Sequence, residues 1–237
     1  MENMNPNKHI SGQFNAELED IRNRVLAMGG LVESQLEQAL DALGSLDAEL
    51  AQKVISGDHK VNGMEVSIDE ECTRIIAKRQ PAASDLRLII TITKSITDLE
   101  RIGDACVRIA KAAVEKRGNN QRPLLVSIEN MGRHATRTLH STLDALARMD
   151  AEAALELHKQ DARLDKEYEG IIRQLMTYMM EDPRSIPEVL DVLWAARAVE
   201  RVGDRCKNIC EYVIYYVKGK DVRHTSYEDM EKDLRQE

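Results

Sequence analysis

The stretch that decides the fold runs from residue 89 to residue 113 and reads "IITITKSITDLERIGDACVRIAKAA". Aliphatic and small residues recur in it at alternating spacings of three and four, namely at Ile89, Ile92, Ile96, Leu99, Gly103, Cys106, Ala110 and Ala113. This spacing places them on one stripe of an α-helix, and its strict alternation is typical of helices that pack in bundles. The sequence therefore predicts a long helix with one buried seam.

The same pattern returns one hundred positions later (200 − 100). Residues 189–213 read "VLDVLWAARAVERVGDRCKNICEYV" and carry a seam in the same register, at Val189, Val192, Ala196, Val199, Gly203, Cys206, Cys210 and Val213. Further upstream, residues 46–68 resemble residues 149–171, so that Asp47 corresponds to Asp150 at an offset of 103 (150 − 47). A repeat of roughly a hundred residues is too long for a solenoid unit. We therefore expect two tandem domains of related sequence.

Each half divides into three helical segments, which predicts an all-α fold of two tandem three-helix bundles. In the first half, a seam over residues 14–32 marks the first helix, and Asp47 is a candidate N-cap for a second helix that runs to about residue 78. Ser84 or Asp85 is then expected to cap the third helix.

The last helix of the second half has its own start signals. Pro187 suits the first turn, and Ser185 with Glu188 forms the pattern of a capping box.

The polar segment "EKRGNNQRP" at residues 115–123 is the best candidate for the linker between the halves. We accordingly predict a first bundle over residues 1–118, a second over residues 119–220, and a polar, loosely held tail over residues 221–237.

Composition narrows the class of protein. Of the 237 residues, 31% are charged and only 3% are aromatic, which suits helices that pack through aliphatic seams. The net charge of −8 argues against a nucleic-acid-binding protein, because such proteins need a basic surface. No apolar run reaches the roughly 18 residues of a membrane span, and we expect no secretory signal because the first twenty residues are polar and acidic. We expect a cytoplasmic protein whose four cysteines are reduced core residues.

Two acids stand four residues apart in each copy of the motif Glu-Arg-aliphatic-Gly-Asp. Such pairs share one helical face, where like charges repel by roughly 0.2–0.5 kcal/mol per pair, so something should compensate them. Carboxylates at this spacing can hold iron, Mn²⁺, Mg²⁺ or Zn²⁺. The candidate ligands are Glu100, Asp104, Glu200 and Asp204, with further oxygen ligands expected from the second helices at Asp58, Asn62, Asp161 and Asp165.

The paired acids also have plainer interpretations. They could be ordinary surface charges, since Asp104 has Arg108 one turn on and Glu200 has Arg197 one turn back. They could instead dock a basic partner surface without any metal. Neither motif has the accompanying histidine of a ferritin-like di-iron site. Arg101 and Arg201 are more simply interpreted as exposed helix residues than as anion ligands.

An enzymatic role has little support in the sequence. Neither GxxxxGK[ST] nor GxGxxG occurs, which argues against nucleotide chemistry. No candidate nucleophile or general base accompanies the acids.

Two longer strings carry a family resemblance. "RQPAASDLRLIITITKSITDLERIGDACVRIAK" (79–111) and "AVERVGDRCKNICEYVIY" (198–215) resemble the two signatures of the PhoU family. The resemblance implies tandem three-helix bundles, metal ions or clusters at Glu100, Asp104, Glu200 and Asp204, and homodimers. It also implies a negative regulator of the phosphate-starvation response that links the ATPase subunit of a phosphate ABC transporter to a sensor histidine kinase. Such a protein would reach the membrane only through its partners.

The two halves depart from symmetry near the acids. Asn62 stands opposite Asp165, and Glu65 stands opposite Tyr168. The two predicted sites therefore need not be equivalent, and the second-helix ligands are less certain than the paired acids.

Overall fold

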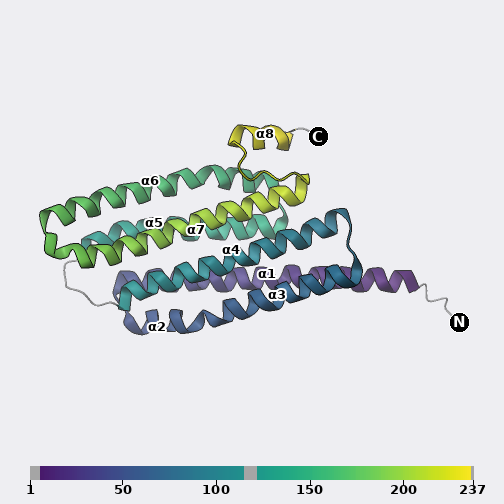
Figure 1. Ribbon diagram of the computed structural model, residues 1–237, viewed down its shortest axis with the longest axis horizontal. Coiled ribbons are helices and arrows are strands. Elements are labelled where there is room, and N and C mark those ends of the chain that lie inside the picture. The colour runs from purple at the N-terminus through teal and green to yellow at the C-terminus, as the bar shows by residue number, and fades with distance from the viewer. Residues whose placement is uncertain (1–5, 115–121, 236–237) are drawn as a thin grey trace.

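The computed structural model of the chain describes residues 6–114 and 122–235, and long helices account for most of them. These helices run roughly along the longest dimension of the molecule (Figure 1). In chain order the elements are α1 (Pro6–Ser45), α2 (Ala48–Gly57), α3 (His59–Arg79), α4 (Ala83–Val114), α5 (Arg122–Arg148), α6 (Ala151–Glu181), the 3₁₀ helix η1 (Pro183–Ser185), α7 (Ile186–Lys218) and α8 (Tyr227–Arg235).

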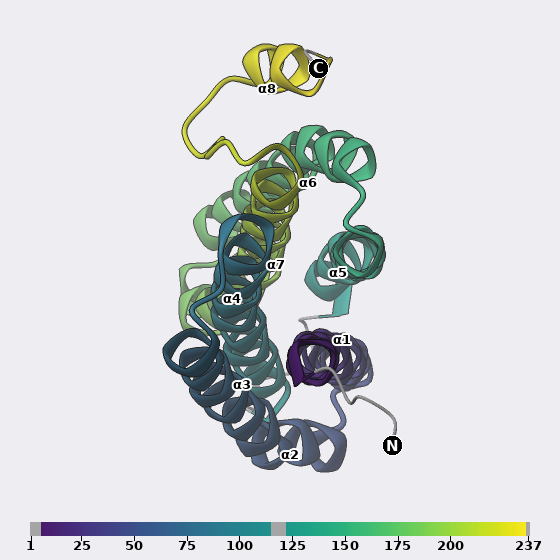
Figure 2. The ribbon, with the colours of Figure 1, turned by 90° about the vertical axis from the view of Figure 1, so that its right-hand side faces the viewer.

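The prediction of two three-helix bundles is confirmed. In the first bundle α1 packs against α3 and α4, and in the second α5, α6 and α7 pack together. The bundles lie side by side, with α4 against α7 and α1 against α5 (Figure 2). The predicted boundary between residues 118 and 119 lies outside the described residues.

The central helices bury more than the predicted seam. Every seam position of α4 and α7 is buried. In addition, α4 buries a second stripe at spacings of four and three, made of Thr91, Ser95, Asp98, Ile102, Ala105 and Ile109. This stripe exists because α4 has a neighbour on each side: its own bundle on one and α7 on the other.

Asp98 makes polar contacts between the bundles. The residue is 1% exposed. Oδ2 accepts a hydrogen bond from the Tyr212 hydroxyl at 2.8 Å, and Oδ1 accepts from Asn208 at 3.3 Å and Arg205 at 3.5 Å. Because these three donors all lie on α7, the buried carboxylate joins the two bundles.

The expected second helix of the first half is divided in two. Asp47 caps α2 as predicted, accepting hydrogen bonds from the amides of Glu49 and Leu50 at 3.0 Å each. However, α2 ends at Gly57 and α3 begins at His59, with Asp58 at the junction. Glycine weakens a helix by about 1 kcal/mol, and the Asp58 side chain is drawn toward α1.

Two predicted caps are wrong. Helix α4 begins at Ala83, so Ser84 and Asp85 lie inside its first turn. The Ser185–Glu188 capping box does not form, because the Ser185 hydroxyl donates to the Asp182 carbonyl at 2.7 Å and makes no cap hydrogen bond to α7. Pro187 does lie in the first turn of α7, as expected.

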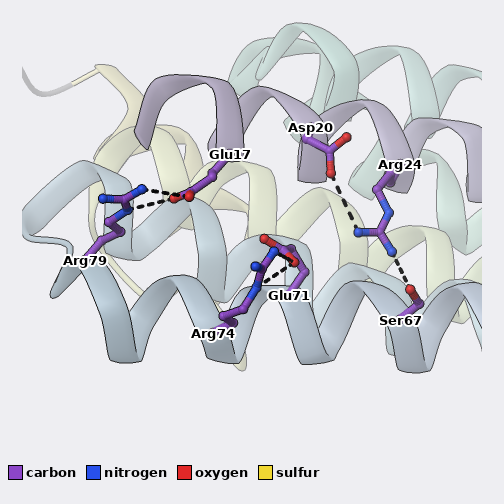
Figure 3. A network of polar contacts seen from close by, with 7 residues as sticks. All are labelled: Glu17, Asp20, Arg24, Ser67, Glu71, Arg74 and Arg79. Carbon is purple, nitrogen blue, oxygen red and sulfur yellow. Dashed lines mark hydrogen bonds and ion pairs between the residues drawn. The ribbon is translucent and has the colours of Figure 1, made fainter. Parts of the chain in front are cut away.

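A row of polar contacts connects α1 to α3 (Figure 3). Arg79 of α3 donates two hydrogen bonds to the Glu17 carboxylate of α1, each at 2.8 Å. About two turns further along α1, Arg24 donates to the Ser67 hydroxyl at 2.6 Å. These contacts fix the register of the two helices along their exposed edge.

The C-terminal tail is held more firmly than predicted. Val222 and Met230 are each 1% exposed, so both belong to the core. Helix α8 packs on α6, where the Tyr227 hydroxyl contacts Glu156 at 3.3 Å. The four cysteines are all buried, as expected of core residues. Among the described helices, none is long and apolar enough to cross a membrane.

Candidate functional site

The first acidic site consists of Glu100 and Asp104 on α4, Asp58 at the α2–α3 junction and Glu65 on α3. Glu100 is half-buried, Asp104 is exposed and Asp58 is 8% exposed. Burial raises the pKa of the Glu100 carboxyl, and the charges of Asp104, Glu65 and Asp58 raise this pKa further. The fold therefore brings several negative charges together. As expected from the sequence, Asp58 lies near the acidic pair of α4.

Asp58 is held in place from two sides. Its Oδ1 accepts a hydrogen bond from the Gln35 amide of α1 at 2.9 Å, and its Oδ2 accepts from Asn62 at 3.4 Å. The seam glycine of α4 makes room for it, since a Cβ at Gly103 would lie 3.0 Å from Asp58 Oδ1. The predicted ligand Asn62 thus contacts the predicted ligand Asp58.

Gln35 is a site residue that the sequence reasoning missed. It is 7% exposed, and its Oε1 is buried without a hydrogen-bond partner in the described structure. A signal was present in the sequence, because Gln35 follows Val32 by three residues and so continues the α1 seam with a polar side chain.

The second acidic site consists of Glu200 and Asp204 on α7 and Asp165 on α6. Glu200 is 8% exposed, Asp204 is half-buried and Asp165 is exposed. Burial raises the pKa of Glu200 and the Asp204 charge adds to this, while Arg197 and Arg201 oppose it.

The two oxygens of Glu200 have different surroundings. Oε1 accepts a hydrogen bond from Arg197 at 2.9 Å, and Oε2 is buried without a hydrogen-bond partner among the described residues. The interpretation of the acids as ordinary surface charges placed Arg197 beside Glu200 and Arg108 beside Asp104. Glu200 does form an ion pair with Arg197, whereas Asp104 and Arg108 form none among the described residues.

The fit of these residues to a metal ion is electrostatic rather than geometric. Besides burial, neighbouring carboxylates raise the pKa of Glu100 and of Glu200, and Glu200 Oε2 is unsatisfied, so both sites suit a cation. Yet among the side chains that the structure describes, no group of three or more acidic, histidine or cysteine ligands converges as a ready-made metal site. The predicted ligand Asp161 cannot be placed, since its side chain lies outside the described residues.

Comparison with known proteins places the chain in a family. Its sequence matches the PhoU domain twice, over residues 25–113 and again over residues 128–213. The chain belongs to the PhoU family. The two matches correspond to the two halves of the internal repeat, and each contains one acidic pair.

Relatives of this PhoU chain match it almost from end to end. It is 60% identical over 234 residues to the phosphate-specific transport system accessory protein PhoU of Serratia marcescens, covering 99% of this chain and 96% of that one. The crystal structure of PhoU from Pseudomonas aeruginosa superposes with a TM-score of 0.83 at 50% identity, covering 87% of this chain and 100% of that one. The phosphate transport system regulatory protein PhoU from Streptococcus pneumoniae gives a TM-score of 0.83 at 32% identity, covering 88% and 99%.

Proposed function

We propose that this PhoU chain is a regulatory accessory protein of phosphate-specific transport. The observation that carries the proposal is the match to the Serratia marcescens protein of that name, which includes both halves of the repeat. A protein made of two packed helical bundles with a charged surface suits a docking role.

The finer proposal is a non-enzymatic adapter that acts in the cytoplasm. In this role the chain, as a homodimer, links the ATPase subunit of a phosphate ABC transporter to a sensor histidine kinase and represses the phosphate-starvation response. The PhoU resemblance supports this link. An adapter of this kind must bind one state of its partner more tightly than the other, because equal affinity shifts no equilibrium.

We further propose that the acidic sites take up metal ions. Glu100 and Asp104, with Asp58, would hold one ion, and Glu200 and Asp204 would hold the other. An iron, Mn²⁺, Mg²⁺ or Zn²⁺ ion would supply the positive charge that these carboxylates lack. The protein's own contribution is to keep Asp58 beside α4 through Gln35 and Gly103.

A metal-free alternative is favoured by one contact. Arg197 already satisfies one oxygen of Glu200, so a guanidinium group can take the place that a metal would occupy. In this alternative, Lys and Arg side chains of a partner protein approach the first acidic site in the same manner.

Metal analysis separates the two proposals. The chain is purified without a histidine tag, and its metal content is measured by elemental analysis. Binding at the acidic sites predicts at least one ion per chain, lost in Glu100→Ala combined with Glu200→Ala. A metal content near zero in the unaltered chain, unchanged by the substitutions, would contradict metal binding and leave the docking alternative.

A gene deletion tests the regulatory role itself. In high phosphate, deletion is expected to switch on a phosphate-starvation reporter, and a plasmid copy of the gene is expected to restore repression. Repression that persists in the deletion strain would count against the proposed function.

A further inference from the structure

A basic groove follows the line where α4 meets α7, on the surface between the two bundles. It consists of two adjoining hollows of about 370 and 290 Å³, which share Arg108, Ala198 and Arg201. We call it the α4–α7 groove. Six cationic side chains line it, namely Arg101, Arg108, Lys111, Arg197, Arg201 and Arg205.

The groove follows from the sequence spacing of the two helices. Its floor contains alanines, among them Ala105 and Ala112 of α4 and Ala198 of α7. Small side chains let the two helices approach closely, while the long arginines one turn away form the rims. The helices are antiparallel. The smaller hollow is lined by Arg101 and Arg205, and the larger hollow by Ala112, which is later in α4, and Trp194, which is earlier in α7.

The charge of the groove is opposite to that of the molecule. The whole chain carries a net charge of −8. Six cations and two acids, Asp104 and Asp191, line the two hollows. With Asp98 and Glu200 counted as well, because they form ion pairs with Arg101, Arg205 and Arg197, the local excess is two positive charges (6 − 4). Arg101 and Arg205 contact the buried Asp98. Arg108 and Arg201 are exposed and belong to none of the ion pairs found within the described ranges.

One end of the groove is apolar. Trp194 lines the larger hollow and is 66% exposed. Leu190 and Ile186 precede it on α7 at intervals of four residues, and each is 39% exposed. They therefore continue the same helical face away from the arginines. Exposed tryptophan beside arginine is the composition found at the centres of protein interfaces.

We propose that the α4–α7 groove docks an extended acidic segment of a partner protein, with apolar residues at one end of that segment. The cations on α4 extend from Arg101 to Lys111, which is about 15 Å at 1.5 Å per residue and matches four or five extended residues at about 3.3 Å each. A small anion would use only one or two of the arginines and would leave the Trp194 face uncovered. The groove adjoins the two acidic sites, since Asp104 of the first site belongs to its lining and its Arg197 donates a hydrogen bond to Glu200 of the second.

Trp194 is the only tryptophan of the chain, so its fluorescence reports on this groove alone. The probe is a synthetic peptide of six alternating Glu and Asp residues followed by two leucines, titrated into the full-length chain. Saturable change in Trp194 emission is expected, with an affinity that falls as salt is raised. Arg108→Glu combined with Arg201→Glu is expected to weaken binding at least tenfold. The matched control is Arg163→Glu combined with Arg173→Glu on α6, which makes the same charge change on exposed side chains outside the groove.

Four outcomes would overturn the proposal. They are the absence of a saturable change, equal binding of a peptide with lysine in place of every acid, equal weakening by the control pair, and binding of pyrophosphate as tight as that of the peptide. The last result would indicate a small-anion site instead. Circular dichroism verifies that each variant is folded. If the charge-reversal variant does not fold, the variant Arg108→Gln combined with Arg201→Gln is used in its place. Peptide binding by that variant as tight as by the unaltered chain would also contradict the proposal.

Discussion

At residue scale, the first acidic site depends on the absence of a side chain at Gly103. The Asp58 carboxylate lies against α4 at the point where a Cβ would come within 3.0 Å of its Oδ1. The sequence indicates that Gly103 is a seam position. It does not indicate that Asp58 packs against this glycine, because the two residues are far apart in the chain and come together only in the folded protein. Gln35, which donates a hydrogen bond to Asp58, stands out in the sequence as a polar residue on the α1 seam, but its partner does not.

Replacement of Gly103 by alanine is expected to destabilise the chain, although alanine favours helix. Alanine should gain about 1 kcal/mol of helix propensity, but its Cβ displaces Asp58 and its hydrogen bond with Gln35. The control is Gly63→Ala on α3, where nothing lies within 4 Å of the added Cβ and the full gain is expected. Urea unfolding measures both variants. If both variants gained the same free energy of unfolding, Asp58 would have moved away from the added Cβ at no energetic cost, which would contradict the prediction.

At the scale of elements, the length and spacing of the seams predicted most of the helices, and the ends of helices were less predictable. The seams of α4 and α7 are local patterns with an average period of 3.5 residues, so they can be recognised from the sequence alone. The break at Asp58 depends on Gln35 of another helix, and the Ser185 hydroxyl is taken by a 3₁₀ turn. In each case one side chain could form either of two hydrogen bonds. The spacing of residues in the sequence does not show which of the two is stronger.

The contact of α1 with α3 gives a pH prediction. Arg79 lowers the pKa of Glu17 below its usual value of 4.5, so the carboxylate stabilises the folded state fully above that pH and loses this contribution as the pH falls through the folded-state pKa. Glu17→Gln is expected to lower the free energy of unfolding by about 1 kcal/mol at pH 7, and by progressively less below about pH 4.5.

Asp20→Asn is the control for this pair. Asp20 is 61% exposed and lies 3.7 Å from Arg24, so its replacement should cost no more than about 0.5 kcal/mol. Urea unfolding at pH 7 and at lower pH measures both variants. A Glu17→Gln effect that is independent of pH would rule out the ion pair as its cause.

At the scale of the whole molecule, the packing of one bundle on the other could not be predicted from the repeat. The duplication indicates two similar domains but does not say which faces meet. The second stripe of α4 contains Thr91, Ser95 and Asp98, whose polarity suggests an exposed face. The structure buries all three residues. Helix α7 supplies hydrogen-bond partners for two of them, the Tyr212 hydroxyl for Asp98 and the Tyr212 carbonyl for Thr91, whereas the Ser95 hydroxyl is buried without a partner among the described residues.

Asp98→Ala is therefore expected to weaken the joint between the bundles. The substitution leaves Tyr212 and Arg205 facing a buried gap, and the loss of a buried, hydrogen-bonded charge should cost about 3 kcal/mol. Thermal unfolding measures the loss. Asp144→Ala is the comparison, since Asp144 is 55% exposed and its i,i+4 pair with Arg148 should be worth at most about 0.5 kcal/mol. Similar melting temperatures for the two variants would refute this role for Asp98.

The central claim is that the two acidic pairs carry the regulatory function, and complementation tests it most directly. A deletion strain receives either the unaltered gene or one encoding Glu100→Gln, Asp104→Asn, Glu200→Gln and Asp204→Asn, which keep the shape of each side chain and remove its charge. With both proteins present in equal amount and folded, we expect the unaltered gene to repress a phosphate-starvation reporter in high phosphate and the fourfold variant to leave it active. Full repression by the variant would contradict the claim.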